Sequence, residues 1–370
     1  MRSKRQRTLT PKMIAHLLQL ADRCVRLAET TRYRETLRSY DSLLRRIAGY
    51  REFDCLTMAA LNDKANCLDK LHRSEAGLAL YDEIVKRCGT AKRFKAVKAR
   101  ALVDKGQTFS SLRRDKEAIA EYDRALRLVV RETALEHREQ RARALVNKGH
   151  SLGELGKHQE EILLCNEVVR RFGQARDLEL IDCVALAMYN RGHALAELNR
   201  HREAVKAYSK VIARFADSKR ESLSLRAIES MVNQAGSLLA LGQYKSAHSV
   251  YRRVAAIVSR NRRTDFRRQG AMALDAQAAM FHHAKQYSQA LRAAYLAIRR
   301  YVDSKDPRTR QAVANAFMTK GFSLHYLGRD GARSVFREVV RRFKNDSLEV
   351  TRQLVELAND CLRMKDFRSR

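Results

Sequence analysis

Small residues recur along the chain at a fixed interval of 43 positions. Each is followed, three and usually six residues later, by a larger apolar residue, which is the spacing of one face of an amphipathic helix. These small positions are Gly106, Gly149, Gly192, Ala235, Ala278 and Gly321. Their regularity indicates a repeat protein, in which each unit buries its apolar face against its neighbours.

A second apolar stripe follows each small position after a short break. The breaks contain Gly156, Asn199, Gly242 and Gly328. Sixteen positions after the small residue come Tyr122, Cys165, Tyr208 and Tyr251. The pattern therefore predicts a helix, a turn and a second helix in each unit, with the small residue where the two helices approach closely.

The pattern extends over nearly the whole chain. It continues upstream at Ala65 and Cys24 in steps of 41 residues, and an eighth unit begins near Phe317. We therefore predict an all-α fold, a right-handed superhelix of about eight helix-turn-helix repeats. Residues 1–12 would be a basic leading segment, 13–346 the repeat array, and 347–370 a capping helix with a basic tail.

The order of residues in each unit resembles the tetratricopeptide repeat. The segments ALVNKGHSLGELGKHQEEILLCNEVV and ALAMYNRGHALAELNRHREAVKAYSKVI carry this resemblance most clearly. The resemblance implies a binding scaffold whose repeat has no catalytic chemistry of its own. Each unit exceeds the usual length of about 34 residues, which we interpret as longer helix ends. Gly89 and Gly173 are expected to end second helices in place of the usual proline.

Composition agrees with a helical fold and adds a strong charge. Only 2 Pro and 15 Gly occur in 370 residues, which is poor material for the frequent turns of a β protein. The formal net charge is +32. Such a chain attracts polyanions, whether nucleic acid, anionic lipid or acidic protein segments, and the charge alone does not distinguish among them.

Cysteine usage and the start of the chain indicate a cytoplasmic protein. The seven cysteines are odd in number and form no Cys-x-x-Cys pair, which favours reduced thiols. No apolar run approaches the length of a membrane span. Residues 13–21 are too polar for a secretory signal, although the lack of an acidic residue before Asp22 leaves an organelle transit peptide as an alternative.

Asparagines at one repeat position are the first candidate binding residues. Asn147, Asn190 and Asn233 each lie two residues before a small position. In the family that this chain resembles, first helices line a concave groove where asparagine ladders hold extended peptides. An amide supplies both a donor and an acceptor for a peptide backbone. The alternative is that each asparagine bonds to a neighbouring repeat. The same groove would contain Val103, Gln107, His150, Tyr189 and His193.

A clamp for a C-terminal carboxylate, as in chaperone-adaptor members of that family, would need several converging cations. Six residues before the small positions of three successive units come Arg143, Leu186 and Glu229, of which only Arg143 is basic. We therefore do not expect chaperone-tail recognition.

Catalytic and metal-binding patterns are weak. Gly149–Gly153 reads G-x-S-x-G, but a nucleophile elbow needs a strand and a strained turn, and Ser151 falls inside a predicted helix. His282 and His325 occupy equivalent positions, as do His150 and His193, but no third ligand accompanies either pair at an obvious spacing. We predict neither an enzyme nor a metal or cofactor site.

A dense group of cations lies between the sixth and seventh units. It comprises Arg252, Arg253, Arg260, Arg262, Arg263, Arg267 and Arg268. Cations near helix C-termini are favoured by the helix dipole, which needs no ligand. Phosphate binding by this basic patch would be sequence-independent and steeply salt-dependent. Most aromatic residues occupy predicted core positions, where they cannot stack on bases.

These patterns predict a non-enzymatic scaffold that binds an extended, acidic peptide or protein segment in its concave groove. The alternative is a nucleic-acid-associated solenoid that binds the phosphate backbone through its arginine ridges.

Overall fold

The structure is a computed structural model that describes residues 10–29, 32–130, 134–259, 261 and 263–364. The basic leading segment therefore lies almost wholly outside the described residues, as does the end of the basic tail. Two compact units are divided between Ala187 and Met188, within a single helix, and each is described by itself.

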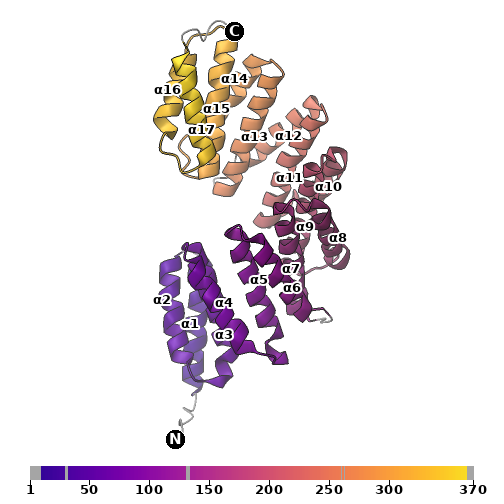
Figure 1. The fold of residues 1–370 in the computed structure, drawn as a ribbon, viewed down its shortest axis with the longest axis vertical. Coiled ribbons are helices and arrows are strands. Elements are labelled where there is room, and N and C mark those ends of the chain that lie inside the picture. Colours follow the sequence, from indigo (N-terminus) through magenta and orange to yellow (C-terminus); the bar gives the residue numbers. More distant parts are fainter. Residues whose placement is uncertain (1–9, 30–31, 131–133, 260, 262, 365–370) are drawn as a thin grey trace. The chain divides into compact units, whose positions relative to one another are not determined.

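The described residues form seventeen α-helices in sequence, with two 3-10 turns and no strand (Figure 1). The first helices of the eight pairs are α1 (Pro11–Glu29), α3 (Asp54–Lys70), α5 (Lys95–Ser111), α7 (Leu135–Glu154), α9 (Leu178–Glu197), α11 (Glu221–Ala240), α13 (Thr264–His283) and α15 (Pro307–Tyr326). The second helices are α2 (Tyr33–Ile47), α4 (Ser74–Cys88), α6 (Asp115–Leu128), α8 (His158–Phe172), α10 (His201–Phe215), α12 (Tyr244–Val258), α14 (Tyr287–Tyr301) and α16 (Ala332–Phe343). The chain continues into α17 (Glu349–Arg363). The prediction of eight helical pairs and a lone final helix is confirmed.

The extra length of the repeat resides in the first helices. From α7 to α15 each first helix has 20 residues, whereas the second helices α8, α10, α12 and α14 have 15. First helices pack on one another from α3 to α7 in the first unit and from α11 to α15 in the second, and each of these helices also packs on its own second helix. They form a layer in each unit, with neighbouring repeats in contact.

The small positions are points of close helix approach, as the sequence predicts. A Cβ atom added to Gly106 would lie 2.5 Å from Cε1 of Tyr122, and one added to Gly192 would lie 2.6 Å from Cε1 of Tyr208. Gly149 differs, because its partner sixteen residues later is the smaller Cys165 and an added Cβ atom would meet nothing closer than 3.7 Å. The tyrosine ring, wedged between the two helices, accounts for the glycine where both occur.

The turn inside each repeat is a helix C-terminus closed by a left-handed residue. Seven residues after the small position φ is positive in each described repeat from the second to the eighth: His72, Arg113, Gly156, Asn199, Gly242, Lys285 and Gly328. The next N–H then bonds back to a carbonyl five residues earlier, for example Gln243 N to Leu238 O at 2.8 Å. This is the Schellman arrangement, which satisfies the last carbonyls of the first helix.

The two glycines expected to end second helices behave differently. Gly89 follows α4 with φ +51°, a conformation that favours glycine. Gly173 follows α8 with φ −57° and ψ −25°, which is ordinary helical geometry. Both glycines directly follow the last residue of a second helix, as expected, but only Gly89 does so in a left-handed conformation.

Apolar cores run through each unit between the helix layers. In the first unit one core includes the fully buried Tyr81 and Tyr122, and in the second unit the largest includes Phe336 and Tyr301. All seven cysteines have free thiols, and six of them are buried. None of the helices in the described ranges has the length and apolar character required to cross a membrane.

Candidate functional site

A polar pocket of about 740 Å³ lies on the first-helix layer of the first unit. Its lining comes only from α3, α5, α7 and α9: Asn66, Asp69, Lys70, Arg100, Asp104, Gln107, Thr108, Ser111, Glu139, Gln140, Arg143 and Glu179. We call it the groove pocket. Every lining side chain carries a hydrogen-bonding group, so the pocket suits a ligand with many donors and acceptors.

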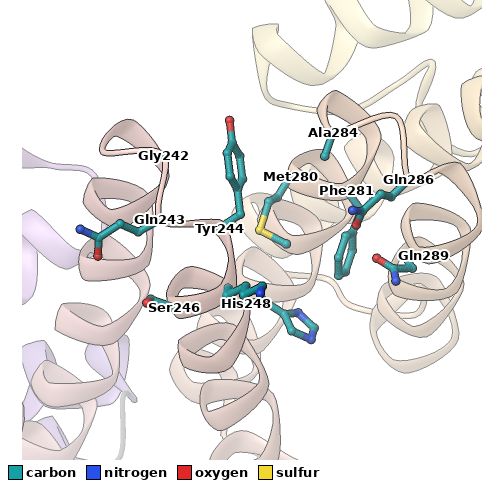
Figure 2. A pocket seen from close by; sticks show the side chains of 11 residues that line it. Gly242, Gln243, Tyr244, Ser246, His248, Met280, Phe281, Ala284, Gln286 and Gln289 are labelled. Atoms are coloured by element: carbon teal, nitrogen blue, oxygen red, sulfur yellow. The ribbon is translucent and has the colours of Figure 1, made fainter.

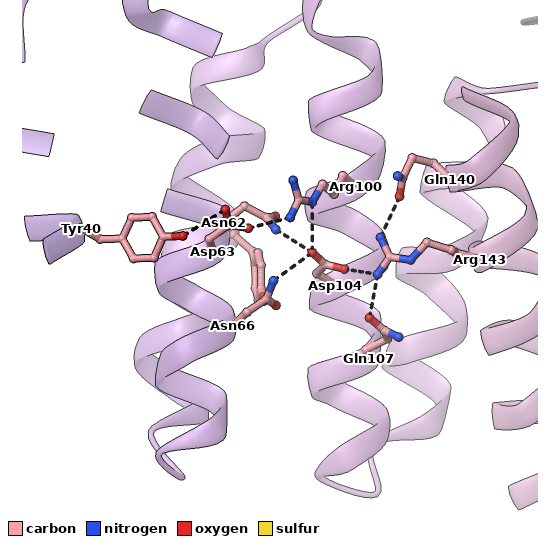
Figure 3. Close-up of polar contacts among 10 residues, drawn as sticks. Tyr40, Asn62, Asp63, Asn66, Arg100, Asp104, Gln107, Gln140 and Arg143 are labelled. Atoms are coloured by element: carbon pink, nitrogen blue, oxygen red, sulfur yellow. Dashed lines mark hydrogen bonds and ion pairs between the residues drawn. The ribbon is translucent and has the colours of Figure 1, made fainter. Parts of the chain in front are cut away.

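A network around the buried carboxylate of Asp104 forms the floor of the groove pocket (Figure 3). Asn62 and Asn66 donate from their amides to Oδ2 at 2.6 and 3.3 Å, and Arg143 Nη2 donates to Oδ1 at 2.5 Å. Arg100 adds its Nε at 3.8 Å from Oδ2. Since Asp104 is only 3% exposed, these partners compensate for the loss of water around its charge.

Arg100 and Arg143 each lie six residues before a small position, where a carboxylate clamp would need its cations. Arg100 lies six residues before Gly106, so this repeat supplies a second cation beside Arg143 that the sequence analysis overlooked. Both guanidinium groups are already paired: Arg100 Nη2 donates to Asp63 at 2.6 Å, and Arg143 contacts Asp104 and Gln107. The two arginines therefore belong to an internal ion network.

The opposite edge of the groove pocket is acidic. Burial raises the pKa of Glu139, and the neighbouring carboxylates of Asp177, Glu179 and Glu136 raise it further. Glu139 and Glu179 both line the pocket. A positively charged or hydrogen-bond-donating group placed between them would relieve this repulsion, whereas an acidic group would increase it.

The three asparagines of the predicted ladder lie in different surroundings. Asn147 is half-buried on α7, and within the described residues its side chain makes no hydrogen bond. Asn190 is buried, at 6% exposure. Asn233 donates from Nδ2 to the hydroxyl of Tyr189, 2.8 Å away on α9, which is the inter-repeat contact that the alternative interpretation predicts.

The other predicted groove residues also divide into exposed and packed positions. His150 and His193 are exposed, and His193 Nε2 lies 3.7 Å from Glu197. Tyr189 is half-buried beneath the guanidinium of Arg226, 4.9 Å from the ring centroid, and burial raises its pKa. In the third repeat Gln107, one residue after the small position, lines the groove pocket, whereas Val103 is completely buried in the core.

The predicted basic patch does not act as one free surface. Arg252 and Arg253 are exposed on α12, but Arg263 pairs with Glu221. Arg260 and Arg262 lie outside the described residues.

The last two arginines of the patch are bonded to neighbouring helices: Arg267 to α14 of its own repeat, and Arg268 to the start of the following repeat. Arg267 donates to the carbonyl of Arg300 at 3.1 Å, and Arg268 makes a bidentate contact with Asp306, at 3.1 and 2.8 Å. Asp306 also caps α15 by accepting from the N–H of Thr309 at 2.8 Å. Arg268 therefore cross-links two repeats, because an arginine near the start of one first helix meets the acidic cap of the next, whereas Arg267 joins the two helices of one repeat.

The side chains of Ser151 and His282 are packed against other side chains of the protein. Ser151 is fully buried inside α7 and contacts the hydroxyl of Ser110 at 3.3 Å, so it is not on the exposed elbow that a nucleophile requires. His282 lies among aromatic rings, with centroids 5.3 Å from Tyr287 and 5.6 Å from Tyr326. Across the described ranges no three His, Cys, Asp or Glu side chains gather as a metal site.

In the second unit, Asp275 on α13 accepts a hydrogen bond from an amide on the next first helix, whereas Asp104 is contacted by a guanidinium. Asn315 Nδ2 donates to it at 3.1 Å. Burial raises the pKa of Asp275 to about 7, and the bond from Asn315 offsets only part of this effect. A carboxyl group with a raised folded-state pKa binds its proton more tightly in the folded protein, so stability falls as pH rises from about 4 to about 7.

We therefore expect Asp275→Asn to be more stable than the wild type at pH 8, by about 1 to 2 kcal/mol, and by a clearly smaller margin at pH 5. Urea unfolding followed by circular dichroism at both pH values tests this. Asp306→Asn is the matched control with the opposite sign, because Arg268 holds the pKa of Asp306 at about 2 and its removal should destabilise the protein at both pH values. Parallel stability profiles for Asp275→Asn and wild type would show that Asp275 titrates normally.

Comparisons with known proteins agree with this architecture. Residues 99–128 and 185–217 match the family model described as tetratricopeptide repeat. No curated protein sequence matches the chain. The solved apo form of RapI is 11% identical, with a TM-score of 0.64 over 94% of this chain and 97% of that chain. The apo form of the quorum sensor NprR from B. thuringiensis is 12% identical, with a TM-score of 0.52 over 94% and 98%.

A third solved structure, a Rap protein complexed with Competence and Sporulation Factor, is 11% identical, with a TM-score of 0.50 over 94% of this chain and 98% of that chain. At these identities the likeness is one of fold. The helical pairs and the polar first-helix layer define an all-helical repeat scaffold. More particularly, its repeats are similar to the tetratricopeptide repeat over the two matched segments, and they recur at a longer interval of 43 residues.

Proposed function

We propose that this chain is a scaffold that holds an extended peptide or protein segment on the first-helix layer of its repeats. The observation that carries the proposal is the groove pocket, about 740 Å³ in volume and lined only by polar side chains of α3, α5, α7 and α9. One of the similar folds is seen in complex with Competence and Sporulation Factor, which supports a binding role for the architecture. The proposal is for a non-enzymatic protein, and the cytoplasmic location stays a prediction.

The charge distribution narrows the proposed ligand. The net charge of +32 favours an acidic segment at long range, an attraction that weakens as salt rises. Close to the pocket, Glu139 and Glu179 disfavour an acidic side chain. The segment that fits both observations is acidic overall and presents an uncharged or basic side chain between these two glutamates.

The asparagine ladder enters this proposal through Asn147. On α7 it lies four residues after Arg143, so the two side chains share one helix face and Asn147 extends the floor of the groove pocket by one turn. A half-buried amide that has no partner among the described residues keeps a donor and an acceptor for a peptide backbone. Asn190 and Asn233 hold the same repeat position in the second unit, where His193 and Tyr189 would be their neighbours.

The test is selection of random twelve-residue peptides on the full-length protein, followed by affinity measurement with labelled synthetic peptides. We expect the selected peptides to lose affinity about threefold to tenfold on Asn147→Ala and again on Gln107→Ala, the effect of one hydrogen bond each. Glu139→Gln should weaken peptides with a basic residue and leave neutral ones unchanged.

Asn233→Ala is the matched control, since it removes an asparagine at the same repeat position outside the groove pocket. Equal affinity of the selected peptides for wild type, Asn147→Ala and Gln107→Ala would place their binding elsewhere and overturn the proposal, as would failure of any peptide to enrich. Circular dichroism of each variant checks that the fold is retained.

A further inference from the structure

A second pocket lies at the turn edge of the sixth and seventh repeats, in the second unit (Figure 2). It has a volume of about 700 Å³ and is formed by the turn after α11, the start of α12, the end of α13 with the turn that follows, and the start of α14. Its lining residues are Gly242, Gln243, Tyr244, Lys245, Ser246, His248, Met280, Phe281, Ala284, Gln286 and Gln289. We call it the turn-edge pocket. None of its residues belongs to the groove pocket.

The walls of the turn-edge pocket combine flat rings with amide groups. Tyr244 is 53% exposed, although it lies beside the half-buried Phe281 and the buried Met280 in the lining. The His248 ring packs edge-on against Phe281, with centroids 5.1 Å apart, and its Nδ1 is held by the amide of Gln277 at 2.8 Å. A planar, partly polar group could stack on these rings while its edge bonds to the amides of Gln286 and Gln289.

The two stretches of chain that form the turn-edge pocket contain basic residues and almost no acidic ones. No Asp or Glu occurs between Glu229 and Asp265, nor between Asp275 and Asp303, and these stretches contain all of α12 and α14. Lys245 lines the pocket itself. Arg252 is exposed one turn beyond His248. Burial lowers the pKa of His248, and the charge of Arg252 lowers it further.

This pattern differs from that of the first-helix layer, where the cations have acidic partners. Arg100, Arg143 and Arg268 each contact a carboxylate at 2.5 to 2.8 Å. On α14, Arg292 is exposed three residues after Gln289 and therefore lies on the same side of the helix. Lys245 thus lines the ring-lined pocket, and Arg252 and Arg292 lie one helical turn from lining residues, in helices without an acidic residue.

A second group of rings continues the turn edge into the eighth repeat. Tyr287 and Tyr326 are stacked, with centroids 4.9 Å apart and planes 9° from parallel, and Tyr326 is 52% exposed. His282 packs against both. The aromatic residues of this edge are therefore available at the surface, which the sequence analysis did not anticipate when it assigned most aromatic residues to the core.

We propose that the turn-edge pocket binds single-stranded nucleic acid, with one base stacked on Tyr244 and Phe281 and the adjoining phosphates near Lys245, Arg252 and Arg292. Single-strand binding combines a positively charged track with aromatic stacking, and both features coincide here. An aromatic peptide side chain could fill the same pocket, but it would leave the three cations without a partner. This proposal does not depend on peptide binding by the groove pocket.

The test measures the binding of full-length protein to fluorescein-labelled twelve-nucleotide oligo(U) and oligo(dT), with an abasic strand of equal length and charge and a duplex as comparisons. Tyr244→Ala should weaken binding of at least one base-containing strand about tenfold and leave abasic-strand binding unchanged. Arg252→Gln should lower the slope of log affinity against log salt by about one. Tyr244 is exposed, so its removal should not unfold the chain.

Two controls separate this site from the general charge of the protein. Tyr295→Ala removes a tyrosine on α14 that is 55% exposed and does not line the pocket, and Arg170→Gln removes an exposed cation from α8. Equal effects of Tyr244→Ala and Tyr295→Ala, abasic-strand binding as tight as base-containing binding, or a preference for duplex would each overturn the proposal. The proposal would also be overturned if a peptide with an aromatic side chain bound at Tyr244 while oligonucleotide binding did not depend on Tyr244.

Discussion

Replacing Arg143 with Met should destabilise the protein by about 3 kcal/mol, although the new side chain has a similar length. The substitution leaves the Asp104 carboxylate, 3% exposed, without the guanidinium that contacts it at 2.5 Å. Asn62 and Asn66 still donate to it, and Arg100 stays at 3.8 Å, so the loss should not reach the upper end for a broken buried pair. Because the chain has no Trp, urea unfolding followed by far-UV circular dichroism is the suitable measurement.

The double variant Asp104→Asn with Arg143→Met should recover most of this loss, because it removes the buried charge together with its partner. Arg114→Gln provides a control at an exposed pair, where Arg114 contacts Glu117 in solvent and little change is expected. If the double variant were as unstable as the sum of the two single variants, Asp104 and Arg143 would be acting independently, and the ion network would not be the reason for the loss.

The fold was predictable because its determinants repeat. A small residue, apolar residues three and six positions later, and a tyrosine sixteen positions later fix two packed helices, and the period copies this local solution along the chain. Each level of the pattern agrees with the others, which is the condition under which sequence determines structure most clearly. The right number of helical pairs followed from counting these positions.

The side-chain partners were harder to predict, since they lie about one repeat apart in sequence. Arg268 looks like part of a free basic patch until Asp306, in the following repeat, is placed beside it. Asn233 looks available for a ligand until the Tyr189 hydroxyl is found 2.8 Å away. Arg100 could have been found from its position six residues before Gly106, but its pairing with Asp63 depends on how neighbouring first helices are packed.

The turn-edge pocket was missed for a related reason. Tyr244 and Tyr287 share one repeat position, nine residues after Ala235 and Ala278, and this could have been read from the sequence. Their spacing does not give their exposure, which is 53% for Tyr244, whereas Tyr287 is half-buried and stacked on Tyr326. The absence of acidic residues from α12 and α14 was the sequence signal that could have drawn attention to this edge.

Two glycines at the same repeat position should respond in opposite ways to alanine. Gly106→Ala places a Cβ atom 2.5 Å from Cε1 of Tyr122, a ring that is 1% exposed and has no space into which it can move. Overpacking of this kind costs about 1 to 3 kcal/mol, which outweighs or matches the gain of about 1 kcal/mol from replacing glycine inside a helix. Gly149→Ala gains the same helix propensity without a clash, since the nearest atom, Cβ of Leu164, is 3.7 Å away.

We therefore expect Gly149→Ala to raise the free energy of unfolding by up to about 1 kcal/mol and Gly106→Ala to lower it by about 1 kcal/mol, in the same urea titration. In a Tyr122→Ala background the Gly106→Ala substitution should cease to be destabilising, because the ring that it meets is gone. Identical behaviour of the two glycines would show that helix propensity alone governs this position. Opposite behaviour that depends on Tyr122 would show that, in the third repeat, the ring sixteen positions later is what requires glycine at position 106.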